Sequence, residues 1–383
     1  MKGLDGIRTD VVGSLLRPGA LADARSRYER GEIGEGQFRA AENDAVDRAI
    51  RLQEQIGLDV VTDGEFRRLN FQDSFGEAVS GYDSGRPTLD FYDQRTAGAQ
   101  PLQRFDLPLS DERAKGTPVV QRQRVAERLR LRRNLVLEEY SYAAAVARKP
   151  VKVTLIGPDR ISQRIDLANS THVYPAMEDF LADVVEVERA MIAGLAGAGC
   201  RYVHIDAPGY TAYVDGPSLD AMRARGEDPI ANFRRSLKAD NDLIRGFGGV
   251  TFGIHLCRGN QRSMWHREGA YDAIAEMLFN ELHHDRFLLE YDSPRAGGFE
   301  PLRFVPKGKT VVLGLVSTKV AQLETIDDLK RRIDEAGRYV ALEQLALSPQ
   351  CGFASEFVGN LLSEDDQKRK LELVVETARQ VWG

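Results

Sequence analysis

Eight short apolar runs, separated by longer amphipathic stretches, constrain the fold of this 383-residue chain more than any other feature of its sequence. Most of the runs are rich in β-branched residues and continuously apolar, which is typical of parallel strands buried on both faces. From them we expect strands at residues 9–12, 58–62, 151–156, 202–205, 251–256, 287–291, 310–316 and 344–348.

The stretches between these runs carry apolar residues at the spacing of an amphipathic helix. The stretch 37–57 ends at Gly57, and a glycine is a common C-terminal signal of a helix. Further helices are expected within 176–199, 270–284, 325–345 and 365–382.

Eight strands that alternate with helices predict an α/β fold of the (β/α)8 type, the TIM barrel. A doubly wound open sheet is the alternative, because βαβ units alone do not fix closure of the sheet, but the count of eight favours the barrel. Residues 81–133 lack this alternation of strands and helices, and we expect them to form an excursion with a hairpin after the second strand. With this excursion, residues 1–383 are predicted to form a single domain.

The composition excludes several classes of protein. Hydrophobic residues make up 42% of the chain and charged residues 29%, and the net charge of −6 argues against a general nucleic-acid or membrane-surface binder. The Arg-rich stretch 121–133 is a local exception that we interpret as a solvated hairpin surface. No apolar run approaches the ~20 residues of a membrane helix, and no signal peptide is recognisable. Three cysteines do not make a disulfide framework, so the cytoplasm is the expected location.

Residues at the carboxyl ends of the strands build the active site in a barrel of this kind. Nearly every expected strand here ends in a residue that is polar or able to bind a metal, and a purely structural scaffold would not need them all there. In chain order they are Gly13 and Ser14, Asp63 and Glu65, Gly157 and Pro158, Asp206, His255 and Cys257, Glu290, Ser317 and Lys319, and Cys351.

Four of these residues could bind a metal, and a closed barrel would bring them to one mouth: His255, Cys257, Glu290 and Cys351. His255 and Cys257 are two residues apart on an extended segment, so they point to the same side. Two thiolates and an imidazole suit Zn²⁺ better than Mg²⁺ or Ca²⁺, which prefer oxygen ligands. The pattern favours zinc over the alternative, in which these are ordinary buried side chains. The fourth ligand is left open between Glu290, water and substrate, and Cys200 is expected to be a packing residue.

Two carboxylates at strand ends, Glu65 and Asp206, suggest recognition of a substrate amine or help with proton transfer. The equally weighted alternative is an internal salt bridge, because Arg67 and Arg68 are close in sequence. Gly13 and Ser14 could offer backbone N–H groups to a substrate carboxylate, or form only a tight turn.

Five motifs at these positions carry a resemblance to a known family: GLDVVTDGEFRRLNFQDSFGE (57–77), HIDAPGY (204–210), HLCRGN (255–260), FLLEYD (287–292) and PQCGF (349–353). They resemble the catalytic half of cobalamin-independent methionine synthase, and more closely the short single-barrel methyltransferases related to it. The resemblance implies a zinc site of His255, Cys257, Glu290 and Cys351. It also implies that Gly13, Ser14, Glu65 and Asp206 hold the amino-acid part of homocysteine.

The chain departs from that family after the seventh strand. The large enzymes carry Asp-x-His there, a histidine thought to assist proton delivery to the departing folate, whereas this chain reads VSTK, with Ser317 and Lys319. The replacement leaves the methyl donor open. Lys319 is a candidate catalytic residue that would bind an acidic donor or polarise its leaving group, with pairing to a carboxylate as its alternative role. Asp206 is the other catalytic candidate.

The expected function is zinc-dependent transfer of a methyl group to a small thiol. The most favoured methyl acceptor is homocysteine, and the most favoured donor is methyltetrahydrofolate. Neither nucleic acid nor a membrane is expected as a partner. Formation of a homo-oligomer is left open. The alternatives are a zinc-dependent thiol alkyltransferase, which would use a methylcorrinoid donor or open an epoxide, and a structural zinc barrel. Tyr210, Trp265 and Phe353 could stack on a flat donor or be ordinary aromatics at the barrel mouth.

Overall fold

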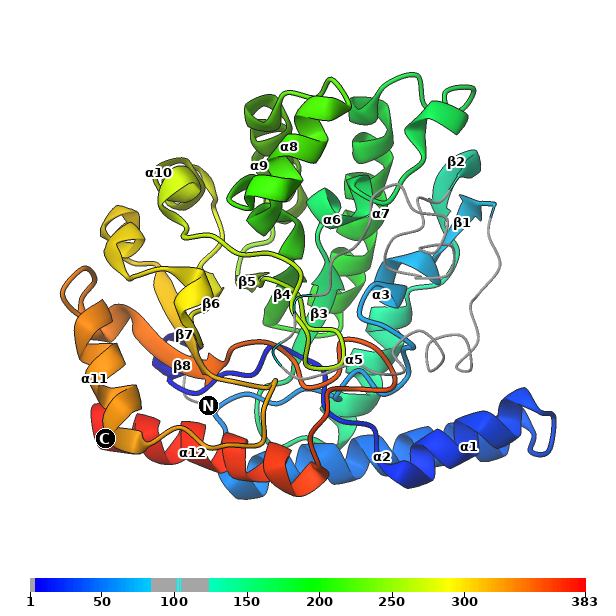
Figure 1. Cartoon of the computed structure of the whole chain (residues 1–383). Coiled ribbons are helices and arrows are strands. Elements are labelled where there is room, and N and C mark those ends of the chain that lie inside the picture. Colours follow the sequence, from blue (N-terminus) through cyan, green and yellow to red (C-terminus); the bar gives the residue numbers. More distant parts are fainter. Residues whose placement is uncertain (1–3, 84–101, 103, 105–123) are drawn as a thin grey trace.

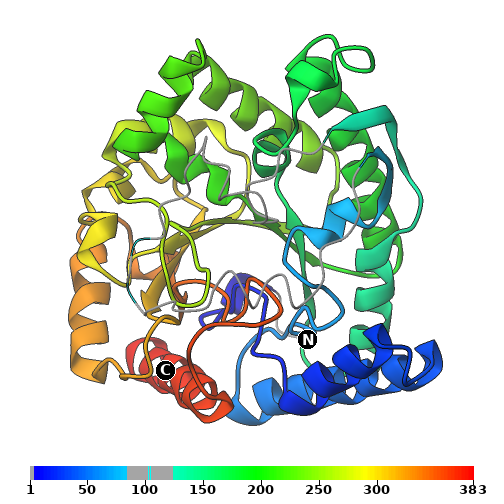
Figure 2. The same cartoon turned by 45° about the vertical axis from the view of Figure 1, so that its right-hand side comes forward.

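A parallel sheet of six strands lies at the centre of the molecule, and the computed structural model describes residues 4–83, 102, 104 and 124–383 (Figure 1). The strand order β3-β4-β5-β6-β7-β8 pairs each strand with its neighbour in sequence. The strands are β3 (Lys152–Ile156), β4 (Tyr202–Asp206), β5 (Thr251–Leu256), β6 (Arg286–Glu290), β7 (Thr310–Val316) and β8 (Leu345–Pro349). Helices surround the curved sheet, as Figure 2 shows.

Six of the eight expected strands are confirmed, with bounds that differ by no more than one residue at either end. The expected strands at 9–12 and 58–62 are wrong, because these segments form only isolated parallel bridges. Thr9 bridges to Leu347 of β8, and Val61 bridges to Val151 beside β3. The two segments therefore occupy the two edges of the sheet and complete an arrangement of the TIM-barrel type.

Side chains replace the backbone ladder between the two edge segments. The Asp59 carboxylate accepts hydrogen bonds from the backbone N–H groups of Arg8 (2.9 Å) and Thr9 (3.0 Å) and from the Thr9 hydroxyl (3.1 Å). The Gln53 side-chain amide bonds to the backbone N–H (3.0 Å) and carbonyl (2.8 Å) of Thr62. Because these backbone groups are satisfied by side chains, no regular strand forms.

Side chains alternate along the strands between the inside of the ring and the layer beneath the helices. Val203 and Ile205 of β4 belong to the main hydrophobic core under the helices. Leu288, Val312 and Ala346 form a separate small cluster on the other face of the sheet. The same alternation places His204 and Asp206 on the inner face of β4.

A buried ionic network closes the amino-terminal end of the ring. Asp10 accepts hydrogen bonds from Lys152 Nζ (2.7 Å) and the Tyr202 hydroxyl (2.7 Å), and it pairs with Arg286 at 3.5 Å. Although burial acts to raise it, the pKa of Asp10 is lowered, because Lys152 and Arg286 favour the charged carboxylate. With this end filled by structural groups, the carboxyl ends of the strands remain for a functional site.

The helices agree with the expected ones except in one place. The expected helix 325–345 ends early, because α11 stops at Ala336 and a 3₁₀ turn (Leu342–Gln344) precedes β8. α12 lies beside α2 (Figure 1). The α-helices are α1 (Gly19–Glu29), α2 (Glu35–Ile56), α3 (Asp73–Gly76), α5 (Leu135–Val146), α6 (Pro158–Ser162), α7 (Met177–Gly197), α8 (Gly216–Ala224), α9 (Pro229–Ile244), α10 (Asp272–Glu281), α11 (Ile326–Ala336) and α12 (Glu364–Trp382).

A two-stranded antiparallel sheet frames the predicted excursion. β1 (Val79–Tyr82) pairs with β2 (Val125–Leu131), and most of the expected segment 81–133 between them lies outside the described residues. Arg128 of β2 is exposed and pairs with Asp183 of α7, which agrees with a solvated surface for this part of the Arg-rich stretch. Among the described helices, none has the length and apolar character needed to span a bilayer.

Candidate active site and metal centre

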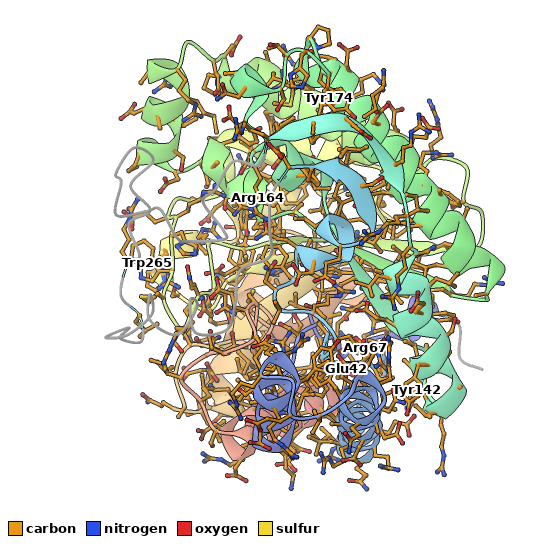
Figure 3. All side chains as sticks on the ribbon, turned by 90° about the vertical axis from the view of Figure 1, so that its right-hand side faces the viewer. Glu42, Arg67, Tyr142, Arg164, Tyr174 and Trp265 are labelled. Atoms are coloured by element: carbon orange, nitrogen blue, oxygen red, sulfur yellow. The ribbon has the colours of Figure 1, made fainter. Side chains whose placement is uncertain are left out.

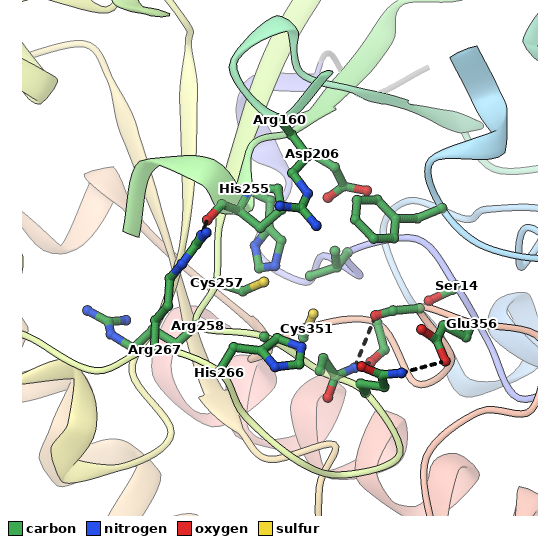
Figure 4. A pocket seen from close by; sticks show the side chains of 18 of the residues that line it. Ser14, Arg160, Asp206, His255, Cys257, Arg258, His266, Arg267, Cys351 and Glu356 are labelled. Carbon is green, nitrogen blue, oxygen red and sulfur yellow. Dashed lines mark hydrogen bonds between the residues drawn. The ribbon is translucent and has the colours of Figure 1, made fainter. Parts of the chain in front are cut away.

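A hollow of about 810 Å³ opens at the carboxyl ends of the strands (Figure 4). Its walls come from segments that are far apart in the sequence, because every strand of the ring ends at this face. Six of the nine predicted site residues line it: Ser14, Glu65, Asp206, His255, Cys257 and Cys351. Of the other three, Gly13 adjoins the hollow through its neighbour Ser14, whereas Glu290 and Lys319 do not line it.

Three of the four predicted metal ligands form one buried group. The potential ligand atoms of His255, Cys257 and Cys351 all lie within 4.8 Å of one another. His255 Nδ1 donates a hydrogen bond to the carbonyl of Leu288 (3.1 Å), so its proton is on Nδ1 and the lone pair is on Nε2. His255 Nε2 is buried and has no hydrogen-bond partner among the described residues.

This donor set fits zinc. Zn²⁺ prefers ligands such as an imidazole nitrogen with a free lone pair and cysteine sulfur atoms. In zinc sites the other ring nitrogen of the histidine commonly donates to a carbonyl oxygen, as Nδ1 of His255 does here, and this bond orients the ring. A hydrogen bond from Cys351 lowers the pKa of Cys257 well below its ordinary value, and the same bond raises the pKa of Cys351. The lowered pKa of Cys257 favours the thiolate, the form of cysteine that binds metals.

Glu290, the fourth predicted ligand, lies at the end of β6 and is fully buried. Its carboxylate accepts a hydrogen bond from the backbone N–H of Arg258 (2.5 Å) and pairs with Arg295 at 3.5 Å. Burial raises the pKa of this carboxyl group. The structure does not place Glu290 within the three-residue group, and its role as a ligand stays a prediction.

Lys319 does not line the hollow but contacts the loop that follows Cys257. Its ammonium group donates to the carbonyl of Gly259 (2.6 Å) and the side-chain oxygen of Asn260 (2.9 Å) and lies 3.5 Å from the carbonyl of Met264. Asn260 in turn donates to the carbonyl of Gly352 (2.6 Å). Lys319 therefore connects the loop after Cys257 to the loop that carries Cys351, and this geometry suits a positioning residue.

The two predicted substrate-binding carboxylates reach the hollow from different sides. Glu65 accepts a hydrogen bond from the Thr154 hydroxyl (2.7 Å), while its second oxygen is buried with no partner among the described residues. Asp206 contacts Nε2 of His204 at 3.2 Å. Burial raises the pKa of both carboxyl groups, that of Asp206 to about 6. A substrate ammonium group would restore their charged forms.

The neighbouring basic residues do not neutralise these carboxylates by a close ion pair. Arg68 makes its short ion pair with Glu139 (2.6 Å) and is 4.0 Å from Glu65. Arg67 pairs with Glu42 at 3.2 Å and lies 5.0 Å from the ring centre of Tyr142 (Figure 3), and it does not line the hollow. Glu65 itself has a φ of +57°, which is uncommon for a non-glycine residue and holds its side chain in place at the wall.

Gly13 and Ser14 form the floor between the carboxylates and the cysteines. A Cβ atom on Gly13 would lie 2.3 Å from Glu65 Oε1, so a glycine is required for that carboxylate to occupy its position. The Ser14 hydroxyl accepts a hydrogen bond from the N–H of Ala354 (3.3 Å), and a Cβ atom on Gly352 would meet it at 2.1 Å. The segment of Ser14 is thus packed directly against the loop of Cys351.

Several residues of the wall were not predicted from the sequence. Arg160, Arg267, His266 and Phe71 line the hollow, although no strand-end pattern marks them. By contrast, Tyr210 and Phe353 are buried in the core. Trp265 does not line the hollow; its indole N–H donates to the carbonyl of Leu102 (3.1 Å). Phe71 and His266 are aromatic residues that do line the hollow.

Comparison with known proteins gives concordant results. Residues 7–97 and 110–380 match the family model described as "Cobalamin-independent synthase, Catalytic domain". The chain is 37% identical over 380 residues to the uncharacterized protein YxjG of Bacillus subtilis, which spans 98% of this chain and 94% of that protein. It is 25% identical over 347 residues to a methionine synthase of Pyrococcus abyssi, with 90% and 85% covered.

The fold has a solved counterpart as well. The B12-independent methionine synthase from Shewanella sp. W3-18-1, in complex with selenomethionine, superposes with a TM-score of 0.71 over 98% of this chain and 97% of that chain. At 19% sequence identity this likeness shows the shared fold.

Proposed function

The chain belongs to the cobalamin-independent methionine synthase family, and from this premise we propose that it transfers a methyl group to the thiol of homocysteine to form methionine. The observation that carries the proposal is the buried group of His255, Cys257 and Cys351 beside an accessible hollow. A structural zinc site is closed by four protein ligands, whereas a catalytic site keeps a position open to substrate. The hollow therefore supports catalysis over a purely structural role.

The proposed cofactor is zinc, held by His255, Cys257 and Cys351, with Glu290 as a displaceable fourth ligand whose position a substrate thiol could take. When bound, zinc would supply a Lewis acid that lowers the pKa of a substrate thiol and keeps the sulfur reactive at neutral pH. The carbonyl of Leu288 fixes the His255 tautomer, and Lys319 fixes the loop that follows Cys257.

Homocysteine has an amine, a carboxylate and a thiol, and the wall offers a group for each. The buried carboxylates of Glu65 and Asp206 would bind the amine, because an ammonium group offsets the cost of their burial. The Ser14 hydroxyl and the backbone beside Gly13 would hold the carboxylate. This arrangement directs the thiol towards the cysteines on the far side of the hollow.

In the proposed reaction, the homocysteine sulfur forms a bond to the methyl carbon while the bond from that carbon to the donor breaks. The donor leaves with the electron pair of the broken bond, and the thiol proton goes to Asp206. Asp206 lines the hollow beside the proposed position of homocysteine and would accept this proton as a carboxylate. Methyltetrahydrofolate is the proposed donor, with a methylcorrinoid as the alternative.

The test compares the wild-type protein with Cys351→Ser and with a control, Cys200→Ser. Cys200 is also buried, but it lies before β4 and outside the hollow. We expect about one zinc per chain and methionine formation in wild type and control, and loss of both in Cys351→Ser. Methyltetrahydrofolate and methylcobalamin are offered separately, so the active donor is identified. A Cys351→Ser variant that forms methionine as well as the wild-type protein would contradict the proposal.

A further inference from the structure

Two polar side chains from adjacent strands contact the carboxylates that line the hollow. Thr154 of β3 and His204 of β4 are partners in the strand register, so they lie side by side in the sheet. The Thr154 hydroxyl donates to Glu65 (2.7 Å), and Nε2 of His204 lies 3.2 Å from Oδ1 of Asp206. Each carboxylate is thus in contact with one polar side chain that does not itself line the hollow.

The imidazole of His204 is the donor in its contact with Asp206. An ionised carboxylate only accepts hydrogen bonds, so the ring proton lies on Nε2. Burial together with the charge of Lys152 lowers the pKa of His204 well below its ordinary value, so the ring is neutral. A cation bound at His255, whose ring centre is 5.9 Å from that of His204, would act in the same direction. His204 therefore orients the carboxylate without cancelling its charge, and that charge is left for a substrate ammonium group.

Packing alone does not account for a histidine at position 204. The side chain is fully buried, and its Nδ1 atom has no hydrogen-bond partner among the described residues. Burial of a polar atom without a partner costs free energy, and an apolar side chain of similar size would avoid this cost. The contact of Nε2 with Asp206 is the interaction that distinguishes the histidine from such a residue.

The His204 ring adjoins a metal-binding residue as well as Asp206, but only Asp206 depends on it. Figure 4 shows His255 and Asp206 close together at the hollow. His255 is oriented by its own bond from Nδ1 to the carbonyl of Leu288 (3.1 Å), and no hydrogen bond joins the two imidazole rings. Within the described residues, the Asp206 side chain forms no hydrogen bond other than the one with His204.

We propose that His204 is a positioning residue that holds the Asp206 carboxylate in the orientation in which it binds the amine of the thiol substrate. This inference rests on the proposed function, which assigns the amine to Glu65 and Asp206. The substrate would touch Asp206, and His204 would act through it. Loss of His204 should therefore weaken binding of the amino acid and leave zinc and the methyl donor unaffected.

The test measures binding of homocysteine and of methionine to the zinc-loaded protein by calorimetry, with no methyl donor present. Methionine has the same amine and carboxylate but no free thiol. His204→Leu removes the N–H donor and keeps an apolar side chain, whereas His204→Gln keeps an N–H group that can reach Asp206. We expect His204→Leu to bind both amino acids about 10-fold more weakly than wild type, and His204→Gln to recover most of this affinity.

His284→Leu provides a matched control. His284 is also fully buried, both of its ring nitrogens lack a hydrogen-bond partner among the described residues, and it lies just before β6, outside the hollow. This variant should bind both amino acids as wild type does. Thermal unfolding verifies that each variant is folded. If His204→Leu does not fold, His204→Asn takes its place, because its shorter amide keeps the polarity but does not reach Asp206.

Zinc affinity is measured in the same proteins by competition with a zinc-binding dye and should be unchanged. A loss of zinc affinity in His204→Leu would assign the ring to the metal centre and overturn the inference. Equal affinity of His204→Leu and wild type for the two amino acids would overturn it as well. A wild-type protein that binds neither amino acid would overturn both the inference and the proposed function.

A kinetic measurement separates this inference from the proposed function. If methionine is formed, the KM for homocysteine should rise about 10-fold in His204→Leu while the KM for the donor stays unchanged. If methionine is formed and the KM for homocysteine does not change, the proposed function stands and the inference fails. If no methionine is formed but binding of the amino acids still depends on His204, the positioning role stands and the proposed function fails.

Discussion

The ammonium group of Lys319 is buried, forms no ion pair within the described residues, and donates to oxygens of the loop that follows Cys257. Its contacts explain how one residue can matter to a metal centre that it does not touch. One of the links between the loop from Cys257 to Met264 and the loop of Cys351 runs through Asn260, which Lys319 holds, and hydrogen bonds such as that from Gln261 to Glu356 (3.3 Å) add to it. We therefore propose Lys319 as a positioning residue.

Replacing Lys319 by methionine should lower zinc affinity about 10- to 100-fold, the usual effect of removing a group that orients metal ligands. The measurement is competition with a zinc-binding dye at constant pH. Lys370→Met provides a matched control, because Lys370 is also buried and donates to the carbonyl of Gln322 (2.7 Å), but it lies on α12 outside the hollow. If both variants lower zinc affinity equally, the effect is general destabilisation and not positioning.

At the scale of the elements, the contact between the two edge segments of the sheet, residues 9–12 and 58–62, depends on side chains. We call this contact the seam. Asp59 makes the contacts that a strand ladder would make, and it accepts three hydrogen bonds across the seam. A regular strand pair would lose little when one side chain is truncated, whereas this seam would lose all three bonds at once. Three bonds of the join thus depend on one carboxylate, while the Thr62 hydroxyl donates to the Gly13 carbonyl (2.7 Å) and the Leu15 N–H to the Gly64 carbonyl (3.1 Å) further along.

Asp59→Ala should lower the free energy of unfolding by about 3 kcal/mol, since hydrogen bonds to a charged group contribute about 1.5–3 kcal/mol each and their loss is partly offset by water. Urea unfolding measures this change. Asp59→Asn keeps an acceptor oxygen and should recover at least half of the loss. An Asp59→Ala variant as stable as wild type would show that the seam is held by packing alone.

The same seam shows what the sequence could predict and what it could not. Periodicity identified the six strands of the sheet, because burial on both faces imposes a continuous apolar run. It could not identify Asp59 and Gln53 as substitutes for a ladder, because that role depends on contacts between distant segments. Strand-end position brought His255, Cys257 and Cys351 together, whereas the orientation of Glu290 and the place of Arg267 depend on loop geometry.

At the scale of the whole molecule, buried acids between the outer helices make stability depend on pH. Glu188 of α7 and Asp240 of α9 are both fully buried, and the Tyr210 hydroxyl donates to Asp240. Burial raises the pKa of Asp240 from 3.8 to about 8 and raises that of Glu188 well above its ordinary value. The folded protein therefore keeps a proton on Asp240 that the unfolded chain has lost above about pH 4.

Because the folded state binds this extra proton between about pH 4 and pH 8, the contribution of Asp240 to stability falls as the pH rises through that window. Asp240→Asn mimics the protonated acid and has no such dependence. We expect the stability of the variant relative to wild type to increase by up to about 4 kcal/mol from pH 5 to pH 8. Urea unfolding of both proteins across this range measures the difference, and parallel pH profiles would contradict the expectation.

The pairing of Thr9 with Leu347, and of Ser14 with the loop after Cys351, also has a consequence for biosynthesis. A ribosome releases the chain from its amino end, so Ser14 emerges long before the residues that complete its surroundings. The last donor of the metal group and the last strand of the ring both arrive near the end of translation. Capture of the proposed zinc should therefore be among the latest steps in maturation, and a stalled nascent chain should carry none.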